Sequence, residues 1–312
     1  MRPTQHSLEP SLSGRDTPVC SLGRALTDTG WFSDVGPVLS WRGGSGGYPY
    51  EEATALLGRL FRWTGNAAGE RRCTEVLESI LQERSMLGRD GLGYAFDSGL
   101  ALPLLREPEP LAERVLGLME SGMASTSVTR PGWWSQSFGC HLLRSLAAVR
   151  RLGFERRVDA LLEELVEQTF DGERFRTRAG SPATYVHAHC YAVEGLLIME
   201  ERLDVALAGA RWLARIQQLD GSFPDWVGRP ESLRPTDSVA QALRIWLLLD
   251  RVEFQRAIES AERYLRRCQA RSGAMLYTPE RSDECSWASI FSLQALTWAS
   301  EGLPSGAAQE LV

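Results

Sequence analysis

Hydrophobic residues recur every three or four positions along much of the chain. Residues 158–170 (VDALLEELVEQTF), 204–218 (DVALAGARWLARIQQ) and 254–268 (FQRAIESAERYLRRC) place apolar side chains at i, i+3, i+4 and i+7, with charges between them. This spacing is typical of amphipathic α-helices. Alternation of apolar and polar residues with a period of two is nearly absent, so the pattern predicts an all-α protein.

A second set of apolar stretches carries fewer charges, and each stretch follows a loop rich in glycine and aromatic residues. These stretches begin at Tyr50, Phe96, Ser135, Tyr185, Thr236 and Ser286, at intervals of about 40 to 51 residues. One low-charge helix and one amphipathic helix per interval predict stacked helical hairpins. We expect the low-charge helices to be buried on all sides.

The first and last predicted helices favour a closed ring over an open solenoid. The sixth low-charge helix runs towards residue 312 without an amphipathic partner, and residues 19–30 (VCSLGRALTDTG) can supply that partner. The sequence therefore predicts six helix pairs around a central cavity, in a single domain over residues 19–312. Residues 1–18 lack the apolar run of a secretory signal, and we expect a flexible leader there.

Composition narrows the class of protein and the type of partner. Hydrophobic residues make up 43% and charged residues 24% of the 312 positions, and no apolar run approaches the roughly 20 residues that span a bilayer. The six cysteines lack CxxC spacing and are expected to be reduced, in a soluble, cytoplasmic protein. A net charge of −6 with scattered arginines argues against nucleic acid and favours a small-molecule, glycan or peptide substrate. The oligomeric state is left open.

Polar residues recur at helical spacing on the low-charge stretches. Three such columns are His187, Tyr191 and Glu194; Asp237, Gln241 and Arg244; and Ser137, His141 and Arg144. Burying an unpaired charge costs several kcal/mol. These columns are therefore expected either to line a water-filled cavity or to pair across the ring.

The loops before the low-charge helices are expected to gather at one mouth of the ring. Their aromatic and acidic residues are Tyr48, Tyr50, Glu51, Glu52, Tyr94, Asp97, Trp133, Trp134, Tyr185, Phe223, Asp225, Trp226, Tyr277 and Asp283. Aromatic faces interleaved with carboxylates suit sugars, and they also suit hydrophobic cations. Alternatively, the rings only plug the end of the barrel.

Proton transfer is the first candidate chemistry. His187 and Tyr191, one helical turn apart, can act as base and acid on a carbon next to a carboxylate that Arg244 or Arg144 holds. This combination serves epimerisation or β-elimination of uronic acids. A carboxylate pair such as Glu51 and Asp237 would instead suit glycosidic hydrolysis. Further substrate contacts are expected from Gln241, Tyr48, Asp97, Trp134, His141, Trp226 and Trp287.

Two alternatives remain. A zinc site could use some of Cys140, His141, His187, His189, Asp283 and Cys285, which lie near the starts of low-charge helices. No metal is favoured, because none of these spacings is a metal motif and helical rotation points neighbouring residues apart. The other alternative is a non-catalytic protein that binds a glycan or a lipid carrier.

Several short motifs resemble known families. QQLDGSFPDW (217–226) resembles the repeat of the prenyltransferase and squalene cyclase superfamily, and YVHAHCYAVEGLL (185–197) resembles the helix start near the zinc of protein prenyltransferase β subunits. This resemblance implies an α/α toroid, with a zinc-dependent cyclase or transferase, similar also to lanthionine cyclases, as one implied activity. The D-x-D-D acid motif of class II terpene cyclases is absent.

A second resemblance covers most of the chain. GGYPYEEAT, AFDSGLAL, DGSF with TDSVAQALR, SWASIFSLQAL and the His187-x-x-x-Tyr191 spacing are similar to VpsJ-like toroid proteins of bacterial exopolysaccharide synthesis. Those proteins resemble the helical domain of D-glucuronyl C5-epimerases and the N-acylglucosamine 2-epimerase group. The resemblance implies an (α/α)6 toroid and a biosynthetic enzyme acting on a sugar. Cys285 departs from the Asn expected in these relatives.

Overall fold

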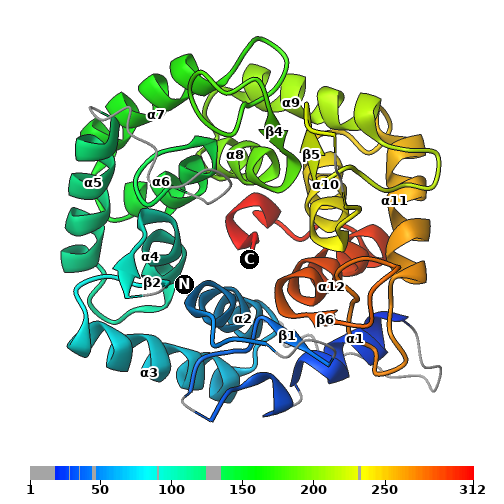
Figure 1. The fold of residues 1–312 in the computed structure, drawn as a ribbon, viewed down its shortest axis with the longest axis horizontal. Helices are drawn as coiled ribbons and strands as arrows, with labels where there is room; N and C mark the ends of the chain where they lie inside the picture. The colour runs from blue at the N-terminus through cyan, green and yellow to red at the C-terminus, as the bar shows by residue number, and fades with distance from the viewer. Residues whose placement is uncertain are drawn as a thin grey trace, which may run out of the picture.

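Twelve α-helices alternate between an inner and an outer ring in the computed structural model, which describes residues 18–27, 29–34, 36–43, 47–89, 91–123, 135–230 and 233–312 (Figure 1). The inner helices are α2 (Glu51–Trp63), α4 (Ala95–Ala101), α6 (Leu143–Arg150), α8 (Val186–Met199), α10 (Thr236–Leu249) and α12 (Ser286–Glu301). The outer helices are α1 (Pro18–Thr27), α3 (Ala67–Glu83), α5 (Glu109–Met123), α7 (Glu155–Thr169), α9 (Leu203–Ile216) and α11 (Gln255–Arg267). The predicted all-α, (α/α)6 toroid is confirmed.

The ring closes as the sequence predicts. The N-terminal helix α1 packs on α12, and α12 packs on α2 (Figure 1). Trp31, which ends the 3₁₀ turn η1 (Thr29–Trp31), is fully buried and donates its indole N–H to the Ala25 carbonyl at 2.8 Å. Pro18 is the first residue of α1, and the rest of the predicted leader lies outside the described residues.

Burial explains the two kinds of helix. In α8, every residue from Val186 to Ile198 is buried, because neighbouring inner helices and α9 surround it. In α11, burial is confined to one stripe made of Ala257, Ile258, Ala261, Tyr264 and Leu265. A helix that is covered on all sides excludes unpaired charge, whereas a helix on the outer ring needs only one apolar face.

Short antiparallel pairings brace the loops that lead into the inner helices. Strand β4 (Thr184–Tyr185) pairs with β5 (Trp226–Val227), and β2 (Gly88–Arg89) pairs with β3 (Leu92–Gly93). Strand β1 (Trp41–Arg42) pairs with β6 (Glu284–Cys285), which ties a loop near the start of the chain to one near its end. These pairings hold the aromatic loops in place around one end of the ring.

The third inner helix starts later than expected. The sequence predicts a helix from Ser135, but α6 begins at Leu143, after the 3₁₀ turn η3 (Cys140–Leu142). Gly139 has a φ of +136°, and a Cβ there would lie 2.9 Å from the Thr177 carbonyl oxygen, so an L side chain does not fit. Ser137 therefore does not share a helix with His141 and Arg144, and the third predicted polar column is wrong at its first member.

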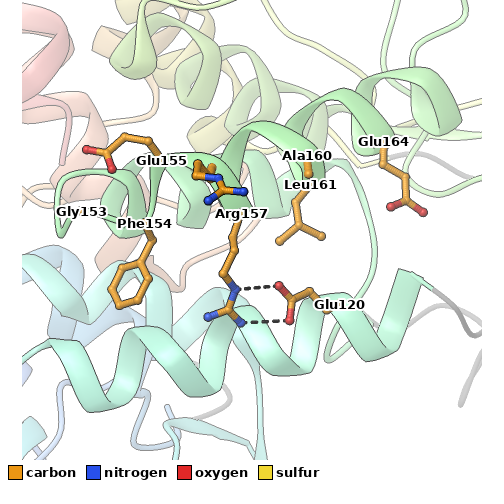
Figure 2. A pocket seen from close by; sticks show the side chains of 9 residues that line it. Glu120, Gly153, Phe154, Glu155, Arg157, Ala160, Leu161 and Glu164 are labelled. Carbon is orange, nitrogen blue, oxygen red and sulfur yellow. Dashed lines mark hydrogen bonds and ion pairs between the residues drawn. The ribbon is translucent and has the colours of Figure 1, made fainter.

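The outer helices contact each other through exposed charges. Arg157 of α7 donates to both carboxylate oxygens of Glu120 on α5, at 2.8 and 2.9 Å, beside a shallow surface groove (Figure 2). Exposed pairs of this kind contribute about 0–1 kcal/mol each, so the buried inner ring carries most of the stability. In the part of the chain that the structure describes, no helix has both the length and the apolar content to cross a membrane.

Candidate functional site

A histidine and a carboxylate face each other where the inner helices begin. Nδ1 of His187, on α8, lies 3.8 Å from Oδ2 of Asp237, on α10. The same Oδ2 accepts a hydrogen bond of 2.7 Å from the indole N–H of Trp287, on α12. Each of these residues lies in the first two positions of its helix, so three loops and three helix starts together fix the arrangement.

The contacts continue into a closed circuit. The Trp287 ring packs edge-on against Tyr50, with centroids 5.6 Å apart, and the Tyr50 hydroxyl donates to Oε2 of Glu52. Oε1 of Glu52 accepts from the Tyr191 hydroxyl at 3.1 Å, and the Tyr191 ring lies 4.6 Å from that of His187. We call His187, Asp237, Trp287, Tyr50, Glu52 and Tyr191 the mouth circuit.

Arg89 connects the mouth circuit to a second acidic residue. From strand β2, Arg89 donates to Glu52 at 2.8 Å and to Asp97, on α4, at 3.4 Å. Asp97 is fully buried, and burial together with the nearby charge of Glu52 raises its pKa to about 7, against the opposing effect of Arg89. The pKa of Asp97 thus lies near neutral pH, beside Glu52, whose two oxygens accept from three donors.

Tyr191 serves as a hydrogen-bond donor in this arrangement. Burial and the charge of Glu52 raise the pKa of Tyr191 well above its usual value. The phenol therefore stays protonated, and its proton points at Glu52. The predicted pairing of His187 with Tyr191 on one helix face is present, and the carboxylate of Asp237 lies 3.8 Å from the imidazole.

Aromatic side chains form a rim around the mouth circuit. Tyr185 and Trp226 stack with centroids 4.9 Å apart, where β4 pairs with β5, and Arg229 lies over Trp226 at 3.6 Å. Tyr48, which is 44% exposed, contacts Tyr50 and Trp41. The predicted aromatic contacts Tyr48, Trp226 and Trp287 thus lie at this end of the ring, whereas Trp134 lies outside the described residues.

Glu51 points away from the mouth circuit. Its Oε2 accepts from the backbone N–H of Gly88 at 2.6 Å, and its Oε1 accepts from Arg84, just after α3. Because successive helical residues are rotated by about 100°, Glu52 faces the mouth while Glu51 faces the α3–β2 connection. The sequence placed both glutamates at the mouth, but only the three-dimensional fold distinguishes them. Nothing local in the sequence marks Arg89.

The predicted carboxylate clamps lie deeper in the ring and have partners within the chain. Arg244 donates to Glu194 at 2.6 Å, and both side chains are fully buried. Gln241 also donates to Glu194, at 3.3 Å, and Arg144 lies 3.9 Å from the same carboxylate. Seven residues of helix span about 10 Å, so Arg244 sits that far along the axis from Asp237. The polar columns pair across the ring, which was one of the two expectations from sequence.

The two histidines next to the mouth circuit, His141 and His189, are buried among residues of the protein core. His141 packs edge-on against Phe96 at 5.2 Å, and burial, with the charges of Arg89 and His187, lowers its pKa to about 3. His189 faces the outer ring: its Nδ1 accepts from the N–H of Phe175 at 3.1 Å, while its Nε2 lies 3.2 Å from the Gly209 carbonyl. These contacts fit a neutral imidazole with its proton on Nε2.

The zinc candidates are dispersed. Cys140 directs its sulfur at the Ala188 carbonyl, 3.5 Å away, and Cys190 directs its sulfur at Ser238. Burial raises the pKa of the Cys140 and Cys285 thiols, and the Asp283 carbonyl accepts from the backbone of Tyr277. Among the described residues, no group of three or more His, Cys, Asp or Glu side chains is placed to hold a metal ion.

Comparison with known proteins supports the fold. No family model and no curated protein matches the chain. An unsaturated glucuronyl hydrolase specific for heparin superposes with a TM-score of 0.66 at 13% identity, covering 91% of this chain and 95% of that one. An unsaturated glucuronyl hydrolase from Bacillus sp. GL1, responsible for glycosaminoglycan degradation, gives 0.63 at 17% identity, covering 90% and 95%. A polysaccharide lyase gives 0.56 at 11% identity, covering 94% and 96%.

These likenesses establish a shared α/α toroid. Identities this low carry no residue roles from one chain to the other. The finer resemblance to VpsJ-like proteins, to epimerases and to prenyltransferases stays a prediction.

Proposed function

We propose that this protein is an enzyme that acts on a sugar-containing substrate by acid/base chemistry at the mouth circuit. The observation that carries the proposal is the contact between His187 and Asp237, with Trp287 fixing the carboxylate. An imidazole that lies 3.8 Å from a buried carboxylate can act with it as a general acid/base pair once the two groups approach to hydrogen-bonding distance.

The neighbouring groups have complementary roles in this proposal. His187 takes the proton from the substrate or returns it, and Asp237 orients the imidazole and stabilises its charged form. Asp97, with its pKa raised to about 7, supplies a second acid at neutral pH. Glu52 holds Tyr191 and Arg89 in place through its hydrogen bonds.

The rim supports a sugar as substrate. Tyr185 and Trp226 stack on each other, and Arg229 covers Trp226, so the rim presents an exposed guanidinium beside aromatic rings, which suits the carboxylate of a uronic acid. The structural neighbours include enzymes named for acting on unsaturated glucuronyl groups, and one polysaccharide lyase. Oligosaccharides that carry an unsaturated or saturated uronic acid are therefore the first substrate class to test. A biosynthetic role, expected from the motifs, is part of the proposal.

The test pairs two histidines of one helix. The purified protein is incubated with unsaturated uronyl oligosaccharides, and loss of the ultraviolet absorbance of the double bond is followed. In parallel, saturated uronic acid substrates are incubated in D₂O to detect deuterium incorporation next to the carboxylate, as an epimerase requires. We expect turnover by the wild type, loss of turnover in His187→Gln, and retention in His189→Gln, because His189 faces the outer ring.

Two outcomes would overturn the proposal. Substrate binding by calorimetry with neither product nor deuterium incorporation would identify a glycan-binding protein. Equal turnover in His187→Gln and the wild type would place the chemistry elsewhere.

A further inference from the structure

The chain's last described residues occupy the centre of the ring, at the end away from the aromatic mouth. After the 3₁₀ turn η4 (Ala307–Glu310), Leu311 and Val312 enter the space between the inner helices (Figure 1). Their exposed fractions are 0% and 1%. Leu311 and Val312 are thus as deeply buried as the core, whereas Gln309 and Glu310 before them are exposed.

Gln294 of α12 binds the main chain of this segment in both directions. Its Nε2 donates to the Glu310 carbonyl at 2.8 Å, and its Oε1 accepts from the N–H of Val312 at 3.2 Å. A side-chain amide that pairs with a carbonyl and an N–H two residues apart reproduces the hydrogen bonds of a neighbouring β-strand. This contact recognises an extended main chain, whatever its side chains are.

Three buried arginines complete the seat. Arg144 donates to the Leu311 carbonyl at 2.6 Å, Arg59 donates to the same oxygen, and Arg244 donates to a main-chain oxygen of Val312 at 3.4 Å. They come from α6, α2 and α10, so the segment joins alternate inner helices across the ring. These contacts also go to main-chain oxygens.

Two of the three arginines share one carboxylate. Among the described residues, Glu194 is the carboxylate that forms ion pairs with Arg144 and Arg244. Burial lowers the pKa of Arg59, and the nearby charges of Arg144, Arg151 and Arg244 lower it further. Because buried guanidinium N–H groups without hydrogen-bond acceptors are costly, the seat requires oxygen acceptors from whatever fills it.

We propose that this end of the ring is a peptide-binding site that holds residues 307–312 as an internal ligand and, when vacated, binds an extended peptide with apolar final residues. The site is distinct from the mouth circuit: Gln294, Arg59, Arg144 and Arg244 recognise peptide main chain, and the proposed sugar chemistry requires none of them. The proposal therefore stands whatever the enzyme assay shows.

The direct test uses a variant that lacks residues 307–312 and the synthetic peptide AAQELV. We expect the variant to melt at a lower temperature than the intact protein, and the peptide to restore the melting temperature with a logarithmic dependence on its concentration. A peptide with an N-methylated valine is the matched control, because it cannot donate to Gln294 and should restore less. Failure of a folded deletion variant to bind AAQELV would overturn the proposal.

A second measurement uses the full chain, in case the deletion variant does not fold. Hydrogen exchange is followed at the amide of Val312 in the wild type, in Gln294→Leu and in Gln309→Ala. Gln309 contacts Glu200 at the exposed edge of the same segment and is the matched control. We expect protection in the wild type and in Gln309→Ala, and at least tenfold faster exchange in Gln294→Leu, corresponding to about 1.4 kcal/mol. Unprotected exchange in the wild type, or no change in Gln294→Leu, would contradict the proposal.

Discussion

Trp287 of α12 donates its indole N–H to Oδ2 of Asp237 on α10, at 2.7 Å, and thereby fixes the carboxylate that faces His187. The two residues lie 50 positions apart in the chain. Their contact links the last inner helix to the proposed acid/base group on α8. Trp287 therefore acts as a hydrogen-bond donor as well as a packing residue at this end of the ring.

Removal of the Asp237 charge is expected to lower turnover of the substrate identified by the assay. We predict that Asp237→Asn reduces kcat by about 10²-fold or more, because the imidazole loses the carboxylate that stabilises its charged form. Trp287→Phe keeps the ring and removes only one hydrogen bond, so its loss should be nearer tenfold, about 1.4 kcal/mol. Initial rates at saturating substrate measure both variants. Wild-type kcat in Asp237→Asn would remove this residue from the mechanism.

Asp97 is expected to make the folded state less stable as pH rises. Its pKa is about 7 in the folded protein and near 3.8 when exposed, so the folded state binds more protons between these values. Stability contributed by this group therefore falls as pH rises from about 4 to 7. We predict that Asp97→Asn gains stability relative to the wild type over this range. Melting temperatures of both proteins at several pH values test this prediction. If the melting temperatures of the wild type and Asp97→Asn changed in parallel with pH, the prediction would be wrong.

His189 is expected to have the opposite pH dependence. Burial lowers its pKa from 6.5 to about 3, so the unfolded chain binds the proton that the folded protein excludes. The stability that neutral His189 provides is present above pH 6.5 and is lost as pH falls towards 3. We predict that the advantage of the wild type over His189→Gln shrinks with acidification. Urea unfolding at neutral and acidic pH measures this difference in stability between the wild type and His189→Gln. A difference that grew at low pH would show that the buried imidazole is not neutral.

Glu194 is expected to be essential for stability. Glu194→Gln leaves the buried guanidiniums of Arg144 and Arg244 without their carboxylate, and breaking a buried pair in this way costs about 3–5 kcal/mol. The matched control is Glu253→Gln, which breaks an exposed pair with Arg211 and should cost under about 1 kcal/mol. Denaturant unfolding gives both values. Similar costs for the two variants would show that the inner network contributes little.

Zinc content is a separate test. We predict that protein purified without a His tag and dialysed carries zinc below one ion per chain, because Cys140, His189 and Cys285 face different surroundings. Inductively coupled plasma mass spectrometry measures the content. One zinc per chain, lost on substitution of His187 or Cys285, would replace the acid/base proposal with a zinc-dependent cyclase or transferase.

The sequence by itself determined the architecture. Charged residues on one stripe of the outer helices, and their scarcity on the inner helices, follow directly from burial, so periodicity predicted the six pairs and the closure by α1. Five of the six inner helices begin within one residue of the predicted starts. The exception, α6, follows Gly139, whose positive φ interrupts the expected helix. The gathering of aromatic loops at one end also follows, because each loop precedes an inner helix.

Only the tertiary structure decided which polar residues meet. Glu51 and Glu52 are adjacent on α2 and therefore point in different directions: Glu52 belongs to the mouth circuit, and Glu51 accepts from the N–H of Gly88. The hydrophobic periodicity does not distinguish these two positions. Arg244 shares a helix face with Asp237, yet it lies about 10 Å deeper, where Val312, Gln294 and Glu194 accept its hydrogen bonds. Helical spacing fixes which side chains share a face. The partners that reach that face come from distant parts of the chain, and only packing places them.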